Sequence, residues 1–339
     1  MRAVNFNQSG ILTNSHFCYR FLQNSCIKHI YPLTFRIIMY IIMWAIIVFT
    51  VLGNMFVIIA ISHFKQLHTP TNYLILSLAI TDLLIGGILM PPTVIRTVET
   101  CWYLGDIYCK FHSSADTMLC MTSLLHIFII SVERYFAICH PLRYKSKFTV
   151  VLITKLVFFC WSLSAMYGFG MIFVGLSINL YDESNYCIGS CVLVQNKVSN
   201  LVSALFTTYM PGLIMVGIYI KIYLVASKQS KSIREMSKEY GDVGLRKRER
   251  KAAKTLAIVL GVFLSCWSPV FFWYTLNPFI TFSAPILVIE FLLLFAYMNS
   301  TFNPLIYAFF YSWFRKALKI IIHGKIFDGN SSSIKLYDE

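Results

Sequence analysis

The sequence predicts an all-α membrane protein, a bundle of seven transmembrane helices followed by a short amphipathic eighth helix. Hydrophobic residues make up 57% of the 339 residues and charged residues only 13%, which is about half the charged fraction of a typical soluble domain. One soluble core cannot hide so much apolar surface, so the lipid bilayer is the expected solvent.

Seven apolar stretches are long enough to cross the ~30 Å hydrocarbon core of a bilayer. They lie at 37–63, 72–97, 106–139, 148–175, 196–226, 252–277 and 283–309. Around this bundle (37–309) we expect an extracellular N-terminal segment over 1–36 and an amphipathic helix on the inner leaflet over 310–325. The last part, 326–339, is expected to be a disordered cytoplasmic tail.

Basic residues set the orientation of the spans. The net charge of +14 would suggest a nucleic-acid partner in a soluble protein. However, 21 of the 29 Lys and Arg residues follow spans one, three, five and seven, and the positive-inside rule assigns those connections to the cytoplasm. The charge therefore indicates how the chain is oriented in the membrane, and a nucleic-acid partner is not expected. We expect a protein of the plasma membrane with its N-terminus on the extracellular side. A glycosylation sequon at Asn7 suits that side.

The cysteines agree with this orientation. Six of the ten fall on the expected outer side, where disulfides persist, namely Cys18, Cys26, Cys101, Cys109, Cys187 and Cys191. No cysteine pair or histidine cluster has the spacing of a metal site, so no metal is assigned. Nothing presents a nucleophile with its base, and no inverted repeat of a transporter is present. We therefore expect neither an enzyme nor a transporter.

Asp116 is the ionisable residue that most needs a reason, because a charge at membrane depth costs at least ~2.5 kcal/mol. It lies 18 residues before Arg134, which is five helical turns, so the two share one face about 27 Å apart. Asp116 is thus near the outer mouth and Arg134 at the inner surface. Asp116 could pair with another span, with Arg96 as the main candidate, or bind a cationic ligand. We favour the ligand.

Asp82, in the second span, allows two interpretations that are compatible with each other. It could be a structural hydrogen-bond hub of the bundle, or it could bind sodium, because small hard cations take oxygen ligands. The polar residues that could converge with it are Ser123, Asn299, Ser300 and Asn303. At the inner boundary, Glu133 beside Arg134 could form a local ion pair that acts as a switch.

Each span also carries a motif, and together the motifs resemble the rhodopsin-like G-protein-coupled receptors over nearly all of residues 37–325. The motifs are "GN" with Asn54, "LAITD" with Asp82, "ERY" at 133–135, Trp161, Pro211 with Tyr219, "CWSP" at 266–269 and "NPLIY" at 303–307. Further segments look like the trace amine-associated receptors: "HFKQLHTPTN", "ETCWYLGD", "KAAKTL", "NSTFNPLIYAFFY" and "WFRKALK". One motif would be weak, but seven in order are highly specific.

This resemblance implies a receptor for a small protonated amine, a trace or volatile amine with olfaction as one expected role. Asp116 occupies the position that holds the ligand's ammonium in these receptors, with Tyr297 bonded to it and Trp267 as the floor. The implied ligand-binding residues are Asp116, Thr117, Cys120, Ser203, Thr207, Trp267, Val270, Phe271, Leu294 and Tyr297. No cofactor is expected other than the structural sodium ion that Asp82 could bind.

The resemblance also implies disulfides and a signalling partner. Cys109 would bridge to Cys191, and Cys26, or alternatively Cys18, to Cys187. A stimulatory G protein (Gs or Golf) that raises cAMP would bind a crevice opened at the inner face. The residues implied in activation and G-protein binding are Glu133, Arg134, Leu142, Tyr219, Asn303, Pro304 and Tyr307.

Several departures from these receptors keep an alternative open. Val270 and Leu294 stand where an aromatic residue is common, so the aromatic cage is thinner and a receptor for a non-amine ligand is the alternative. The fifth span has no second acid near Ser203, which argues against a diamine held at both ends, although Glu290 could serve instead. A retinal photoreceptor would need a lysine in place of Tyr297 and is not expected.

Overall fold

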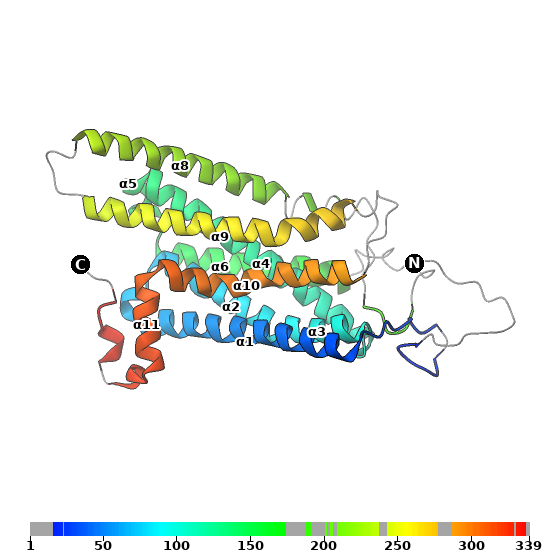
Figure 1. Cartoon of the computed structure of the whole chain (residues 1–339). Helices are drawn as coiled ribbons and strands as arrows, with labels where there is room; N and C mark the ends of the chain where they lie inside the picture. Colours follow the sequence, from blue (N-terminus) through cyan, green and yellow to red (C-terminus); the bar gives the residue numbers. More distant parts are fainter. Residues whose placement is uncertain are drawn as a thin grey trace.

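The computed structural model describes residues 16–22, 24–173, 187–191, 201, 204–205, 209–236, 243–276, 286–328 and 330–336. Long helices run side by side in one elongated bundle, and the two ends of the chain lie at opposite ends of it (Figure 1). The helices are α1 Leu33–His63, α2 Pro70–Leu84, α3 Met90–Glu99, α4 Gly105–Cys139, α5 Pro141–Lys147, α6 Val150–Phe173, α8 Met210–Met236, α9 Val243–Leu276, α10 Ile286–Phe310 and α11 Ser312–Ile322.

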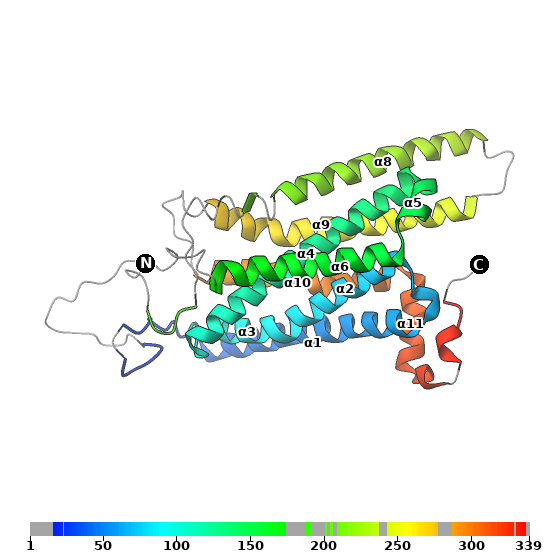
Figure 2. The same ribbon diagram turned by 180° about the vertical axis from the view of Figure 1, so that it is seen from behind.

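The expected spans correspond to these helices. The second span is formed by α2 and α3, joined by a π-helical turn, η2 Ile85–Leu89, and the first part of the fifth span falls outside the described residues. Within the described residues, four helical segments are long and apolar enough to cross a membrane, and two shorter apolar helices, Met210–Val225 and Ala257–Trp273, accompany them. α4 runs obliquely between α6 on one face and α10 on the other (Figures 1 and 2).

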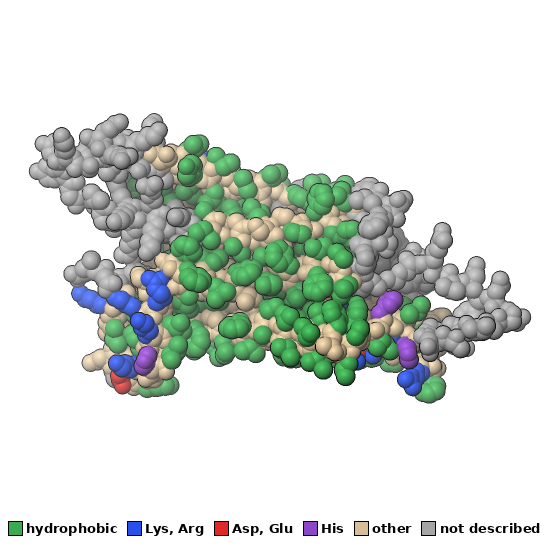
Figure 3. All heavy atoms as spheres, viewed as in Figure 1, with side chains coloured by type: hydrophobic (Ala, Val, Ile, Leu, Met, Phe, Trp, Pro, Cys, Tyr) green, Lys and Arg blue, Asp and Glu red, His purple; other side chains and the backbone are tan. Residues whose placement is uncertain are grey.

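The surface of the bundle matches a lipid environment. Hydrophobic side chains form a broad band across its middle, whereas Lys and Arg gather at the end around α11, with a smaller basic group near the N-terminal segment (Figure 3). The same band contains large exposed side chains such as Phe49, Phe158 and Phe309. Because lipid tails are as apolar as these side chains, their exposure carries no penalty in a bilayer.

Small residues let the helices approach closely. A Cβ atom at Gly53 would stand 2.9 Å from Pro304 Cβ, so α1 and α10 touch at that point. The neighbouring Asn54 is buried and donates from Nδ2 to the Thr50 and Ser300 carbonyls, at 2.9 and 3.0 Å. The "GN" motif therefore fastens α1 to α10 by one steric and one polar contact, as membrane helix packing favours.

The C-terminal end differs from expectation. The amphipathic helix is present as α11, which lies across the inner end of the bundle (Figure 1) with Trp313, Phe314 and Ala317 buried. Beyond it, the chain is not disordered as expected but forms two 3-10 turns, η6 Lys325–Phe327 and η7 Ser331–Ser333. The mostly polar composition of this tail gave no sign that one of its apolar residues, Leu336, lies in the core with no exposed surface.

Candidate ligand-binding site and cytoplasmic switch

Asp116 lies on α4 and is partly exposed. The Tyr297 hydroxyl on α10 donates to Asp116 Oδ1 at 2.9 Å, and the Cys120 thiol, one turn further along α4, lies 3.4 Å from the same oxygen. The contact from Tyr297 is the one that the resemblance implied. Among the residues that the structure describes, none of the four ion pairs includes Asp116.

The expected alternative partner of Asp116 is engaged elsewhere. Arg96 donates from Nη2 to Glu290 Oε2 at 3.5 Å and from Nη1 to the Cys191 carbonyl at 3.4 Å. Thr97 donates to the same Glu290 oxygen at 2.7 Å. Glu290 therefore does not simply face water at the outer end of α10, because Arg96 and Thr97 on α3 both hold it.

Side chains of α4 and α10 contact Asp116 directly, and α9 contributes to an apolar cluster beside Cys120. Cys120 packs against two apolar clusters, one containing Trp267 and Val270 and the other containing Leu294 and Tyr297. The Trp267 ring stacks on Phe271 with their centroids 5.3 Å apart. Of the other implied ligand-binding residues, Thr117 donates a hydrogen bond from its hydroxyl to the Ser113 carbonyl at 2.9 Å. Ser203 and Thr207 lie outside the described residues.

Asp82 lies inside the bundle and has no exposed surface. Asn303 on α10 donates from Nδ2 to Asp82 Oδ2 at 2.7 Å. Four buried oxygens of the proposed sodium set have no hydrogen-bond partner in the described part of the chain: Asp82 Oδ1, Ser123 Oγ, Asn299 Oδ1 and Asn303 Oδ1. Buried polar atoms normally find a partner. These four oxygens have the chemistry of ligands for a small cation such as sodium.

Within the described residues, no group of three or more His, Cys, Asp and Glu side chains could hold an ion. Ser300, the remaining member of the proposed sodium set, is buried on α10 and accepts from Asn54 through its carbonyl.

At the inner end of α4, Glu133 is fully buried and holds Arg134. Arg134 Nε donates to Glu133 Oε2 at 2.5 Å. Two hydroxyls complete the arrangement, because Thr71 and Tyr144 donate to Glu133 Oε1 at 2.8 and 2.5 Å, and Arg134 also donates to Thr71. Burial, together with the negative charge of Glu133, raises the pKa of Tyr144 to about 12, so the phenol keeps its proton at physiological pH.

The local ion pair of Glu133 and Arg134 was predicted, but its two hydroxyl partners were not. Thr71, near the start of α2, and Tyr144, in the middle of α5, are common uncharged residues in two separate helices. Nothing in their spacing indicates a shared acceptor. Leu142, in the same short helix α5 as Tyr144, is 91% exposed. This exposure is compatible with the G-protein contact that the resemblance implies for Leu142.

The two tyrosines implied in activation occupy separate apolar surroundings. Tyr219 on α8 packs against the cluster of Ile138 and Ile222, whereas Tyr307 on α10 is 2% exposed in a cluster with Trp313. Both therefore lie at the inner end of the bundle, but in different clusters.

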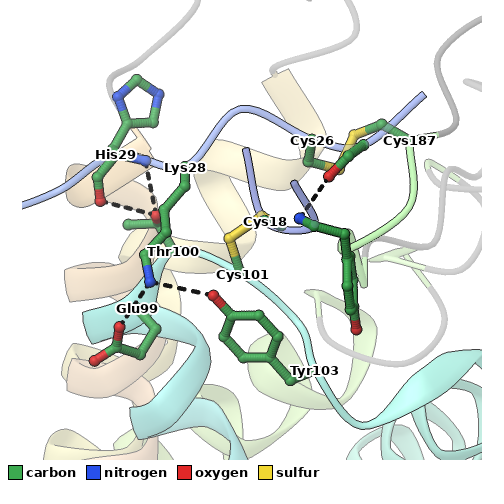
Figure 4. The surroundings of a disulfide bond; sticks show 11 residues. Cys18, Cys26, Lys28, His29, Glu99, Thr100, Cys101, Tyr103 and Cys187 are labelled. Atoms are coloured by element: carbon green, nitrogen blue, oxygen red, sulfur yellow. Dashed lines mark hydrogen bonds and ion pairs between the residues drawn. A yellow bond between two sulfur atoms is a disulfide. The ribbon is translucent and has the colours of Figure 1, made fainter. Parts of the chain in front are cut away.

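Three disulfides fasten the outer end. Cys109–Cys191 and Cys26–Cys187 are both present, as the resemblance implied. Cys18, the alternative partner of Cys187, instead bridges to Cys101 (Figure 4). The Cys18 and Cys26 backbones pair with each other, and the Cys26 amide also donates to the Ile188 carbonyl. Cys26 is thereby held beside Cys187, and Cys18 meets the segment after α3.

Polar contacts reinforce this outer end of the bundle. Lys28 Nζ donates to Glu99 Oε2 at 3.0 Å and to the Tyr103 hydroxyl at 3.2 Å (Figure 4). Arg36 pairs with the other Glu99 oxygen, to which Tyr40 also donates at 3.1 Å. Glu99, a partly buried acid on α3, therefore ties both the N-terminal segment and α1 to α3, in addition to the cystines.

Mapping of the cystines checks the bridge that the sequence missed. After proteolysis without reduction, we expect the peptide containing Cys18 to be linked to the peptide containing Cys101. In Cys101→Ser, Cys18 should become free to react with an alkylating reagent, whereas in Cys187→Ser it should stay protected. A peptide that links Cys18 to Cys187 in the unsubstituted protein would contradict the structure.

The class of the protein follows from this architecture together with comparison to known families. The family model described as "7 transmembrane receptor (rhodopsin family)" matches residues 53–307. This range runs from the contact of Gly53 with α10 to the buried Tyr307, and it contains the surroundings of Asp116 and of Glu133. The fold and the site thus define a seven-transmembrane signalling receptor of the plasma membrane that couples to a G protein, and not an enzyme.

Comparison with individual proteins assigns the chain to a subfamily of these receptors. The chain is 44% identical over 334 residues to trace amine-associated receptor 1 of Macaca mulatta, covering 95% of this chain and 98% of the relative. It is 43% identical to trace amine-associated receptor 4 of Rattus norvegicus (95% and 96%) and 45% identical to human trace amine-associated receptor 2 (91% and 89%). The chain belongs to the trace amine-associated receptors of the rhodopsin family.

Proposed function

We propose that the chain is a receptor for small protonated amines that signals through a stimulatory G protein, Gs or Golf, to raise cAMP. The observation that carries this proposal is Asp116, a partly exposed carboxylate at the outer part of the bundle that receives a hydroxyl and a thiol, but no cation among the described residues. A carboxylate at that depth is costly without a positive partner. A ligand ammonium would supply that partner, and the names of the relatives refer to amines.

The proposal places the N-terminus outside the cell, where Asn7 could carry a glycan. Two features support this orientation. The cystines cluster at the N-terminal end of the bundle, and disulfides persist in an oxidising compartment. Basic residues gather at the opposite end around α11, as expected for the cytoplasmic side.

The ligand that fits best is a monoamine of small size. A second ammonium would need another acid, and Glu290 is already held by Arg96 and Thr97. Val270 and Leu294 line the two clusters beside Cys120 with aliphatic rather than aromatic surface. A compact or volatile amine suits such walls better than an extended aromatic one, and detection of such amines in olfaction is the role that we propose.

Signalling would follow from a shift between two states. In the structure, Glu133 and its hydroxyl donors hold Arg134, which we assign to the inward-closed state. An amine bound to Asp116 favours the state in which Arg134 is released, Tyr219 and Tyr307 rearrange, and a G protein enters beside Leu142. By thermodynamic reciprocity, the bound G protein raises the affinity for the amine.

The experiment that tests the function is a cAMP assay in cells that express the chain, with a panel of primary, tertiary and di-amines. We expect a response to small monoamines that disappears in cells without stimulatory Gα subunits. A response through another G protein would overturn the choice of partner. Silence across the panel, with the receptor at the cell surface, would favour the alternative, a receptor of this fold for a non-amine ligand.

The oxygens around Asp82 lead to a separate proposal, that Asp82, Ser123, Asn299, Ser300 and Asn303 bind sodium. We expect the purified receptor to unfold at a higher temperature in NaCl than in KCl at equal ionic strength. An ion present at ten times its Kd stabilises the folded state by about 1.4 kcal/mol. Asp82→Asn should remove the difference between the two salts, and Asp106→Asn, at the outer start of α4, should leave it unchanged.

A further inference from the structure

The chain after α11 doubles back onto the inner end of the bundle. Gly324 ends the helix with a positive φ of 69°, a conformation that glycine adopts without strain. Two 3-10 turns follow, and this segment runs beside α11 toward the inner end of α1 (Figure 1). We call residues 325–336 the C-terminal clip.

Leu336 anchors the clip in the apolar core. Its side chain has no exposed surface and belongs to the same cluster as Phe64, Leu67 and Trp313. Its backbone amide donates to Gln66 Oε1 at 2.7 Å. Gln66 and Leu67 are part of η1 Lys65–Leu67, the short connection between α1 and α2. The end of the clip therefore contacts the first cytoplasmic loop in two ways. The Leu336 side chain packs against Leu67, and the Leu336 amide donates a hydrogen bond to Gln66.

Ser331 forms the second anchor and is only 4% exposed. Its hydroxyl donates to the Ile326 carbonyl at 2.7 Å and lies 2.9 Å from Nε2 of His63, the last residue of α1. A serine hydroxyl can donate one hydrogen bond, and Ser331 donates it to the Ile326 carbonyl. The second bond is therefore donated by His63 Nε2 to the Ser331 oxygen. Ser331 thus closes the turn of the clip and joins it to α1 at the same time.

These contacts distinguish the clip from a tail that rests on the surface by chance. Of the apolar side chains in residues 330–336, Leu336 is buried whereas Ile334 is 39% exposed. The two serines after Ser331 are more exposed than Ser331 itself. The two buried residues of this segment are therefore one serine and, five residues later, one leucine. Ser331 bonds to His63 at the end of α1 and Leu336 to Gln66 in η1.

We propose that the first cytoplasmic loop and α11 form a docking socket for the chain's own C-terminal clip. The apolar part of the socket is Phe64, Leu67, Trp313, Phe314 and Ala317. His63 and Gln66 recognise the clip through hydrogen bonds, and the required pattern in the occupant is a serine followed by an apolar residue at the fifth position. Without the clip, a socket of this composition would be uncovered at the inner end of the receptor.

The socket is continuous with the inner end of α10. The Tyr307 and Tyr311 rings lie 5.8 Å apart, and the Tyr311 and Trp313 rings 5.7 Å apart. Tyr307 belongs to the same apolar cluster as Leu336. Release of the clip is therefore expected to loosen not only the last residues but also the packing where α10 passes into α11.

Hydrogen–deuterium exchange of the full chain in lipid nanodiscs tests the proposal. In Leu336→Asp we expect at least tenfold faster amide exchange over 325–336 and in η1, because a carboxylate cannot occupy the apolar socket. The matched control is Ile334→Asp, which adds the same charge two residues away at an exposed position and should exchange as the wild type does. Ser331→Ala should also speed exchange, and Ser333→Ala should not.

Three outcomes would overturn the proposal. The first is exchange over 325–336 that is as fast in the wild type as in the isolated peptide. The second is exchange that changes equally in Leu336→Asp and Ile334→Asp. The third is protection that is present in nanodiscs and lost in detergent, which would mean that lipid rather than the socket covers Leu336. As an independent measure, Gln66→Cys with Leu336→Cys should cross-link on oxidation, and Gln66→Cys with Ser333→Cys should not.

Discussion

Replacing Asp116 by alanine is expected to lower amine potency more than a hundredfold in the cAMP assay. The substitution leaves the ligand's ammonium without its counter-ion, and truncating one partner of a buried charge pair typically costs ~3–5 kcal/mol. Asp116 has no ion pair among the described residues that its removal would break. The Tyr297 hydroxyl does lose its acceptor, so surface expression of the variant must be measured alongside amine potency.

Graded variants separate the charge from the shape of the site. Asp116→Asn keeps the size of the side chain and should lose nearly as much potency as alanine. Tyr297→Phe removes one hydrogen bond to the carboxylate and should lower potency by roughly 10- to 150-fold, since a hydrogen bond to a charged group contributes ~1.5–3 kcal/mol. Asp106→Ala, an exposed acid on the same helix, is the control. Unchanged potency in Asp116→Ala, at normal surface expression, would refute the amine site.

Replacing Glu133 by alanine is expected to raise cAMP in the absence of ligand and to lower the thermal stability of the purified receptor. Glu133 is fully buried, and the Arg134 side chain beside it is 14% exposed. Removing the acid leaves Arg134 without its charge partner, which typically costs ~3–5 kcal/mol. The closed state bears that cost, so the population moves toward the open state.

Substitutions of Thr71 and Tyr144, whose hydroxyls donate hydrogen bonds to Glu133, should weaken the closed state by smaller steps. Tyr144→Phe and Thr71→Val each remove hydrogen bonds within the arrangement, so each should raise basal cAMP less than Glu133→Ala does. Arg143→Ala, an exposed cation next to Tyr144, controls for a change of charge in α5. If Glu133→Ala left both basal cAMP and thermal stability as in the wild type, the proposed closed state would be wrong.

The course of the bundle was predictable because hydropathy and the positive-inside rule act on long segments. The pairing of Tyr297 with Asp116 came from the family resemblance, since two residues 181 positions apart carry no local sign of contact. The bridge between Cys18 and Cys101 was missed because six outer cysteines allow fifteen pairings, which sequence cannot choose among. Composition also misled at the C-terminus, where one serine and one leucine decide the order of a segment that otherwise looks like a solvated tail.

The three cystines also have a consequence for how the receptor is made. Cys26 and Cys109 are synthesised before their partners, Cys187 and Cys191, which lie 161 and 82 residues further along the chain. At translation rates of ~5–20 residues per second, the second of these intervals lasts roughly 4–16 s. During that time Cys18 and Cys101 are the only native pair that is already complete among the four outer thiols, and Cys26 and Cys109 are free to bond wrongly. We therefore expect that correct pairing during synthesis requires thiol–disulfide exchange, which breaks wrong bonds and lets the native ones form.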